Sequence, residues 1–196
     1  MSGRGHREFS PPWWLKLSAM LLLLMAALLL VYYGRNGTLP FMHSRFYTAE
    51  IRAAAERHGL PPELVRAVVR RESRFDASAV GGAGEIGLMQ LLPSGAAAEW
   101  ARVNKRPAPG DRELFDPEFN LEIGCWYLAR AMKRWRKYRC AAELALAEYN
   151  AGAKNAARWA PADPRATDVT GRIDYPGTRD YVREIMEDYR RHRNEK

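Results

Sequence analysis

An uncharged, leucine-rich run near the N-terminus divides this chain into two parts that we expect to fold separately. From Leu17 to Gly34 the sequence holds no charged residue, and leucine dominates between Leu21 and Leu30. As a helix, the run would be about 27 Å long, which is just enough to span the hydrocarbon core of a bilayer. The run therefore predicts one N-terminal transmembrane helix, which we place at residues 17–33.

The flanks of this run predict its orientation and argue against its cleavage. Trp13–Trp14 and Tyr32–Tyr33 would form aromatic belts at the two membrane surfaces, and the basic residues before the run place residues 1–16 in the cytoplasm. A cleaved signal peptide is the alternative, but bulky aromatic residues stand where a small-residue cleavage site is needed. We therefore expect a single-pass anchor in the cytoplasmic (inner) membrane, a tether over residues 34–44, and an extracytoplasmic (periplasmic) domain over residues 45–196.

Helical periodicity dominates the second part of the chain, and its length suits one domain with a sizeable core. The expected fold class is mainly α, and only the glycine-rich stretch Gly81–Gly87 hints at a small β-hairpin. The expected helices are Thr48–His58, Pro61–Ser73, Ser94–Trp100, Pro117–Arg136, Cys140–Tyr149 and Tyr175–Arg190.

A glutamate at the end of the second of these helices is the main candidate for chemistry. Leu64, Val68 and Glu72 lie four residues apart, so Glu72 continues an apolar stripe that faces the core. Burial disfavours the charged carboxylate and raises its pKa, as a general acid at neutral pH requires. The spacing alone equally allows a glutamate that points to water or pairs with Arg71 or Arg74.

Four glycines within Val80–Gly87 predict a tight loop or hairpin shortly after that helix. The segment Leu88–Pro93 that follows is apolar apart from Gln90. A buried glutamine amide needs partners for both its donor and its acceptor, and an N-acetyl group or a ring hydroxyl would serve. Gln90 is therefore a candidate substrate-binding residue. The alternative is a structural glycine loop followed by core residues, and for the three leucines of the segment we expect the core.

Several motifs, in a fixed order, resemble the soluble lytic transglycosylase (SLT) domain, a lysozyme-like family that cleaves the glycan strands of peptidoglycan. The resemblance runs from about Thr48 to Tyr189 and implies a mainly α, lysozyme-like domain with a small β-hairpin in its glycine-rich loop. The motifs are Glu72–Phe75, Gly84–Pro93, Phe115–Leu128, Glu148–Gly152 and Thr178–Val182.

The resemblance implies a mechanism with a single catalytic acid, Glu72. It would protonate the glycosidic oxygen between N-acetylmuramic acid (MurNAc) and N-acetylglucosamine (GlcNAc). It would then act as a base toward the C6 hydroxyl of MurNAc, which closes a 1,6-anhydro ring without water. Tyr149 would lie near Glu72 and orient it through its hydroxyl. The candidate substrate-binding residues are Ser73, Met89, Gln90 and Asn150. Of these, Ser73 is expected mainly to support the local backbone.

Goose-type lysozymes resemble the same motifs but hydrolyse with water, and they are the nearest alternative. They typically carry an aspartate two residues after the glutamine, where this chain has Leu92, so the sequence favours the non-hydrolytic route. Asp76 and Glu85 remain possible second carboxylates. A non-catalytic peptidoglycan-binding anchor is a further alternative, against which the intact acid argues. A phage-type endolysin with a releasable anchor is another, against which the strongly apolar run argues.

Two positions depart from the family pattern close to the proposed site. Gly81 stands where a serine is common, which removes a hydroxyl that could contact substrate. Glu148 replaces the usual small residue before Tyr-Asn-Ala-Gly and is expected to place a second carboxylate near the site.

The net charge of +8 fits anionic partners, and a basic face that is simply solvated explains it equally well. We find no nucleic-acid motif, so peptidoglycan glycan strands and membrane headgroups are the expected partners, and no nucleic acid is. A role in clearing wall for a secretion or division machine fits, but the sequence names no such partner. The four histidines are dispersed outside the motifs, so we expect no metal and no cofactor. If the helices that carry Cys125 and Cys140 form an antiparallel hairpin, Cys125 lies about 15 Å from the turn at which Cys140 lies. A disulfide needs Cα atoms within about 7 Å, so we expect two separate buried thiols.

Overall fold

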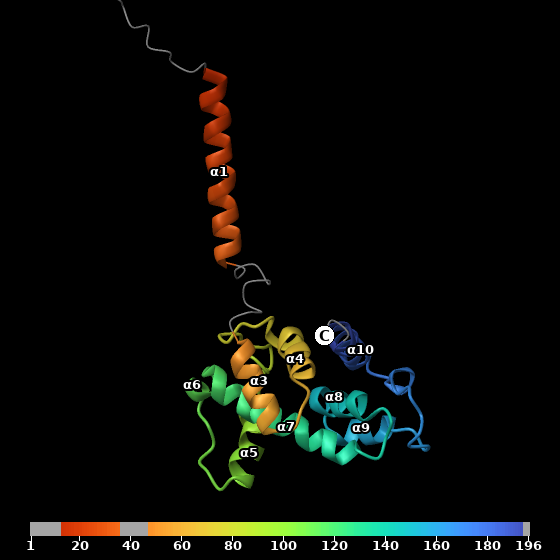
Figure 1. Ribbon diagram of the computed structural model, residues 1–196. Helices are drawn as coiled ribbons and strands as arrows, with labels where there is room; N and C mark the ends of the chain where they lie inside the picture. The colour runs from red at the N-terminus through yellow and green to blue at the C-terminus, as the bar shows by residue number, and fades with distance from the viewer. Residues whose placement is uncertain (1–12, 36–46, 194–196) are drawn as a thin grey trace, which may run out of the picture. The chain divides into compact units, whose positions relative to one another are not determined.

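The structure is a computed structural model that describes residues 13–35 and 47–193. It divides into two compact units, Met1–Pro40 and Phe41–Lys196. In the first unit, helix α1 covers Trp13–Arg35 as a single continuous helix (Figure 1). Most of the expected cytoplasmic segment (residues 1–16) and most of the expected tether (residues 34–44) lie outside the described residues.

Helix α1 exposes large apolar side chains along its length, among them Leu23, Leu28 and Val31. Within residues 13–35 and 47–193, no helix combines the length and the apolar character needed to cross a membrane. The transmembrane helix expected from the sequence therefore stays a prediction.

The second unit is built from helices, which confirms the mainly α class. All six expected helices are present, with ends that differ by a few residues, while α6, α9 and η2 were not expected. The elements are α3 (Thr48–Arg57), α4 (Pro62–Ser73), η1 (Pro93–Ala97), α5 (Ala98–Val103), α6 (Asp111–Leu114), α7 (Pro117–Trp135), α8 (Ala141–Ala151), α9 (Ala153–Trp159), η2 (Thr170–Arg172) and α10 (Pro176–Arg193). The expected helix Ser94–Trp100 corresponds to η1 and α5, with non-helical backbone angles at Gly95.

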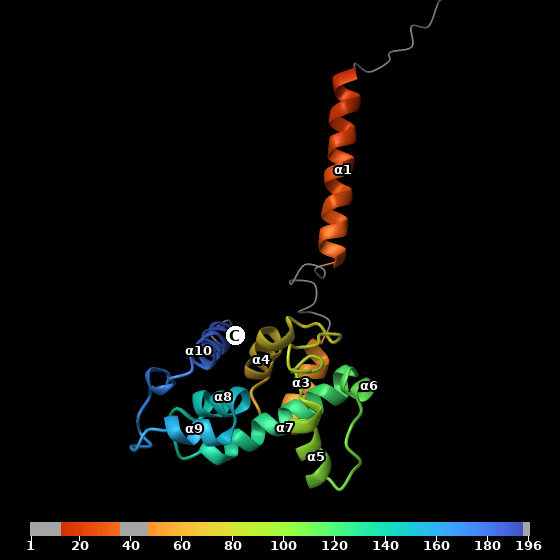
Figure 2. The same ribbon diagram turned by 180° about the vertical axis from the view of Figure 1, so that it is seen from behind.

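The longest helix of this unit, α7, packs against α3, α5, α6 and α8. It begins cleanly because Pro117 occupies its first turn and the Asp116 side chain accepts a hydrogen bond from the backbone N–H of Phe119 at 2.8 Å. Helix α10 packs against both α4 and α8, so the C-terminal helix lies beside the helix that ends in Glu72. Figures 1 and 2 show this arrangement from opposite sides.

The glycine-rich loop after α4 forms the small hairpin that the sequence suggested. Ile86 makes isolated antiparallel bridges to Val80 on one side and to Leu91 on the other. Leu91 and Leu88 are buried as expected, but Leu92 is 37% exposed, so the expectation of a core position is wrong there. Leu92 lies directly before the turn η1, where the chain leaves the hairpin, and its side chain is therefore not enclosed.

Both cysteines are free and buried, Cys125 within α7 and Cys140 just before α8, which confirms two separate thiols.

Candidate active site

Glu72 lies in the last turn of α4, on the face that the sequence predicted. Leu64 and Val68 are buried on the same face, and Glu72 itself is half-buried. The helix ends there because Arg74 and Phe75 both take left-handed backbone angles, with φ of 54° and 66°. Two such residues in succession cost free energy, which the surrounding packing must offset, and this kind of strain gathers at functional sites.

The environment of Glu72 keeps its carboxyl group partly protonated at neutral pH. Burial raises the pKa of Glu72 from 4.5 to about 7, while the hydrogen bond from Tyr181 and the charge of Arg71 lower it and the charge of Glu85 raises it. The increase confirms the direction expected from the apolar stripe. A carboxyl group that titrates near pH 7 can act first as a general acid and then as a base.

The residue that holds the Glu72 side chain is Tyr181, which sequence reasoning did not single out. Its hydroxyl donates a hydrogen bond to Glu72 Oε1 at 2.6 Å, and the ring is 2% exposed between α10 and its neighbours. Arg71 pairs with Glu184 at 2.7 Å, so the alternative in which Arg71 neutralises Glu72 is not the one observed. The available signal was the position of Tyr181 in the last family motif.

Tyr149 corrects one expectation from the sequence. Its hydroxyl donates to the backbone carbonyl of Met89 at 2.8 Å, not to Glu72. The acid still acts on this residue: burial first, and then the charge of Glu72, raise the pKa of Tyr149 well above its ordinary value. Tyr149 therefore fixes the loop beside the acid, and the hydroxyl that contacts the acid comes from α10.

Met89 was expected to line a sugar subsite, but its side chain lies in the core. It is 0% exposed and packs closely on Gly124 of α7, where a Cβ would overlap the thioether sulfur. The flexible, apolar thioether suits a position in the core, and the absence of a side chain at Gly124 leaves room for it. Met89 thus anchors the loop to α7 and does not face substrate.

Asn120 of α7 holds the same loop through all of its polar side-chain atoms. Its Oδ1 accepts from the backbone N–H of Met89 at 2.8 Å, and its Nδ2 donates to the carbonyls of Ile86 at 2.9 Å and Leu114 at 2.8 Å. Gly87 has a φ of 78°, and a Cβ there would overlap the amide of Asn120. The glycine of Gly-Leu-Met-Gln is therefore required both by the backbone and by this contact.

Gln90 ends this motif in a strained conformation at the edge of the core. Its φ is 46°, in the left-handed region that a residue with a side chain seldom adopts. Its Nε2 donates to the carbonyls of Gly87 at 2.9 Å and Ala79 at 3.2 Å. The amide is therefore fixed by the loop, and its oxygen Oε1 keeps its acceptor capacity.

The remaining expected residues divide between support and exposure. Ser73 is buried, and its hydroxyl contacts the carbonyls of Leu88 at 2.9 Å and Val69 at 3.2 Å, which agrees with support of the backbone. Asn150 is exposed at the end of α8, and its Oδ1 accepts from Thr178 Oγ1 at 2.7 Å. Asn150 therefore keeps its amide nitrogen for a ligand.

Three other carboxylates had been considered for a second role near the acid. Glu148 is 3% exposed, accepts from Trp135 Nε1 at 2.7 Å and pairs with Arg134 at 3.3 Å, so it belongs to the contact between α7 and α8. Asp76 accepts from the backbone and hydroxyl of Ser78. The expectation that Glu148 adds a carboxylate to the site is therefore wrong. Of the three carboxylates, only Glu85 influences the pKa of Glu72.

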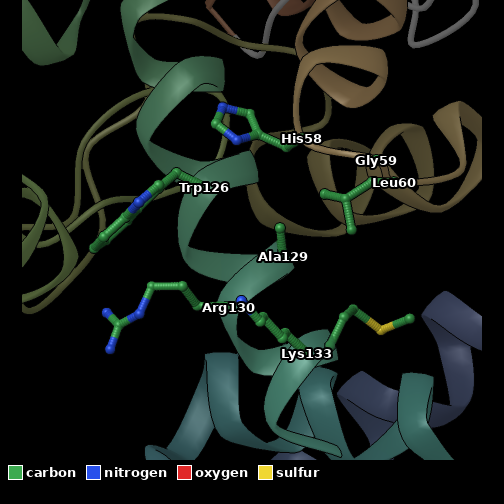
Figure 3. A pocket seen from close by; sticks show the side chains of 8 residues that line it. His58, Gly59, Leu60, Trp126, Ala129, Arg130 and Lys133 are labelled. Carbon is green, nitrogen blue, oxygen red and sulfur yellow. The ribbon is translucent and has the colours of Figure 1, made fainter. Parts of the chain in front are cut away.

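A separate pocket of about 420 Å³ lies between the end of α3 and the middle of α7 (Figure 3). It is lined by His58, Gly59, Leu60, Trp126, Ala129, Arg130, Met132 and Lys133. Two of its polar side chains already have partners, since His58 contacts Glu122 at 2.8 Å and Arg130 pairs with Glu99 at 2.7 Å. Among the described residues, no three side chains of His, Cys, Asp or Glu gather as metal ligands there or elsewhere.

Comparison with known proteins identifies the family of this chain. The family described as "Transglycosylase SLT domain" matches residues 49–168. Membrane-bound lytic murein transglycosylase C of Haemophilus influenzae is 36% identical over 88 residues, which are 44% of this chain and 25% of the relative. A putative soluble lytic murein transglycosylase of the same species is 30% identical over 151 residues, which are 76% of this chain and 24% of the relative.

Solved structures agree with this match. The lytic transglycosylase Slt of Pseudomonas aeruginosa, solved as the inactive mutant E503Q, aligns with a TM-score of 0.65 and 31% identity over 74% of this chain and 23% of the other. The 70 kDa soluble lytic transglycosylase of Escherichia coli aligns with a TM-score of 0.65 and 26% identity, over 73% of this chain and 23% of the other. The chain thus spans about a quarter of the length of these two curated relatives.

Proposed function

Because this chain belongs to the transglycosylase SLT-domain family, we propose that it is a peptidoglycan lytic transglycosylase that cuts the β-1,4 bond between MurNAc and GlcNAc. The observation that carries the proposal is one half-buried acid, Glu72, whose pKa is raised to about 7 and whose oxygen accepts the Tyr181 hydroxyl. A single acid of this kind serves a reaction in which the substrate supplies its own nucleophile.

In the first step Glu72 donates its proton to the glycosidic oxygen. The bond from C1 of MurNAc to that oxygen breaks, GlcNAc leaves as an alcohol, and positive charge develops at C1. Burial raises the free energy of the carboxylate that remains, and the hydrogen bond from Tyr181 partly offsets this cost. Tyr181 therefore makes the proton easier to give up without lowering the pKa out of the useful range.

In the second step the same carboxylate takes the proton of the C6 hydroxyl of MurNAc. The C6 oxygen bonds to C1, a 1,6-anhydro ring closes, and Glu72 regains its proton for the next cycle. The exposed amide of Asn150 and the fixed amide of Gln90 would contact sugar groups beside the acid. Leu92, half-exposed and apolar, cannot assist a water molecule at the position where goose-type lysozymes typically carry an aspartate.

We place the enzyme in the cell envelope, held by α1 in the cytoplasmic membrane with the domain of residues 45–196 outside the cytoplasm. Three observations support this placement: the uncharged run Leu17–Gly34, the exposed apolar side chains of α1, and relatives that are named membrane-bound. The test is extraction of a membrane fraction with alkaline carbonate. An integral anchor keeps the chain in the pellet, and release into the supernatant would contradict the anchor.

The test of the reaction is digestion of purified sacculi with the full-length chain, followed by mass spectrometry of the released muropeptides. The expected products carry 1,6-anhydro-MurNAc ends, are lighter than hydrolysis products by one water, and are missing with Glu72→Gln. Products that carry only reducing ends would instead make the chain a hydrolase. Binding to sacculi without any product would make it a wall-binding anchor.

A further inference from the structure

The glycine-rich loop holds a second carboxylate at a place made available by a missing side chain. A Cβ at Gly81 would overlap Glu85 Oε2 and would lie 2.7 Å from Gln90 Oε1. Both oxygens therefore lie beside the Gly81 backbone and at most 5.0 Å from each other, since they are 2.3 and 2.7 Å from the same point. A serine, which is common at this position of the family, would displace the Glu85 carboxylate, so the glycine and the glutamate fit each other.

Glu85 Oε2 and Gln90 Oε1 can each accept a further hydrogen bond. Glu85 Oε2 accepts from the backbone N–H of Ala83 at 3.0 Å, and the described residues offer Glu85 no ion pair although the chain holds 31 lysines and arginines. The amide nitrogen of Gln90 is occupied by two backbone carbonyls, and this occupation orients Oε1. A water molecule, which donates twice, can bridge two acceptors at this separation.

The same loop is held against the end of α4 that carries the catalytic acid, because Ser73 Oγ donates to the carbonyl of Leu88 at 2.9 Å. The charge of Glu85 is one cause of the raised pKa of Glu72, whereas neither Asp76 nor Glu148 contributes. The other groups that act on Glu72 are Tyr181 from α10 and Arg71 from α4. Among the described residues, Glu85 is therefore the one additional carboxylate whose charge acts on the pKa of the acid.

We propose that Glu85 and the oxygen of Gln90 hold a water molecule beside Glu72, and that this enzyme hydrolyses a share of the bonds that it cuts. The inference rests on the proposed function, since it concerns the second step of the same reaction. It assigns to Glu85 the role of base toward water, a role that Leu92 cannot fill.

The hydrolytic branch shares its first step with ring closure. Glu72 protonates the glycosidic oxygen, the C1–O bond breaks, and GlcNAc leaves with that proton. In the branch, the water oxygen bonds to C1 and one water proton passes to Glu85. The product is MurNAc with a free reducing end. Glu85 then loses its proton to solvent, and Glu72 takes a new proton from solvent.

The experiment counts both kinds of end in one digestion. Sacculi are first reduced with borohydride, so that any reducing MurNAc end found after digestion is new. They are digested with the full-length chain in mild detergent, and the muropeptides are quantified by mass spectrometry. The variants are Glu85→Gln, whose amide cannot take a proton, and Gly81→Ser, whose side chain displaces the carboxylate. Glu187→Gln, which removes an exposed carboxylate from α10, is the matched control.

The wild-type chain is expected to form both ends, and each loop variant is expected to lower the reducing share at least tenfold while anhydro ends persist. The control is expected to keep the wild-type ratio. A wild-type digest with anhydro ends alone, or an unchanged ratio in Glu85→Gln, would overturn the inference and leave the transglycosylase intact. A digest with no new end of either kind would overturn the proposed function as well.

Discussion

Two glutamates of this domain, the half-buried Glu72 at the end of α4 and the buried Glu148 near the end of α8, have opposite surroundings. Glu148 is 3% exposed and has an arginine partner and an indole N–H donor. Glu72 is less buried and accepts from a tyrosine hydroxyl, while Arg71, whose charge acts on it, pairs with Glu184. A cation makes a buried carboxylate a structural contact, whereas a neutral donor leaves it able to exchange a proton. Burial alone does not separate the two roles.

The substitution Glu72→Gln is the strongest test of this contrast. The amide keeps the shape and the contact with Tyr181, but it cannot give or take a proton. We expect a loss of turnover of at least about 10³-fold, because one group serves both steps. The measurement is the rate of anhydro-muropeptide release from sacculi. Glu148→Gln is the matched control and should keep most of the rate per folded molecule; a reversed result would exchange the roles of the two residues.

Glu148→Ala should have the complementary effect, on stability and not on chemistry. It leaves the buried Trp135 N–H without its acceptor and removes the partner of Arg134. We expect a loss of roughly 2–3 kcal/mol in the free energy of unfolding. Urea unfolding of the full-length chain measures this value. Glu148→Gln retains an acceptor and should lose less, and equal losses would show that the hydrogen bond to Trp135 contributes little.

Tyr181→Phe should slow the reaction while it leaves the core packing unchanged. The lost hydrogen bond stabilises the charged form of Glu72, so its removal raises the pKa of the acid further and makes proton donation harder. We expect a roughly 10-fold lower kcat and a basic limb of the pH–rate profile that moves to higher pH. Tyr149→Phe, which loses a bond to a backbone carbonyl, should change the rate by less than about threefold and leave the limb in place.

The raised pKa of Glu72 also predicts a small dependence of stability on pH. Because the folded pKa of about 7 exceeds the ordinary value of 4.5, the stabilising contribution is complete below pH 4.5 and is lost as the pH rises through 7. The amide of Glu72→Gln does not ionise, so this variant keeps its stability as the pH rises. Above pH 7 its free energy of unfolding should exceed that of wild type by about 1 kcal/mol, after a discount for partial exposure, and its Tm by about 2–4 °C. Thermal melts of both proteins at pH 4 and pH 8 measure this difference. A constant difference across that range would contradict the buried, proton-exchanging acid.

The loop around Gly-Leu-Met-Gln shows why the local pattern predicted some positions and missed others. Glycine spacing predicted a tight hairpin, and the structure has one at Val80, Ile86 and Leu91. The apolar run after it did not reveal which side chains would be enclosed. Met89 packs on Gly124 of α7 and is buried, whereas Leu92 is half-exposed, because enclosure depends on a helix that lies some thirty residues further along the chain.

The sequence by itself determined six of the helical segments, the face of α4 that carries Glu72, the glycine hairpin and the family. These depend on periodicity, turn chemistry and motif order, which are local or linear properties of a chain. Only the tertiary structure decided which partner each carboxylate has. Tyr181 stands 109 residues after Glu72, and the contact exists because α10 packs against α4. Glu148 stands directly before Tyr149 yet bonds to α7, because helical geometry turns neighbouring side chains toward different elements.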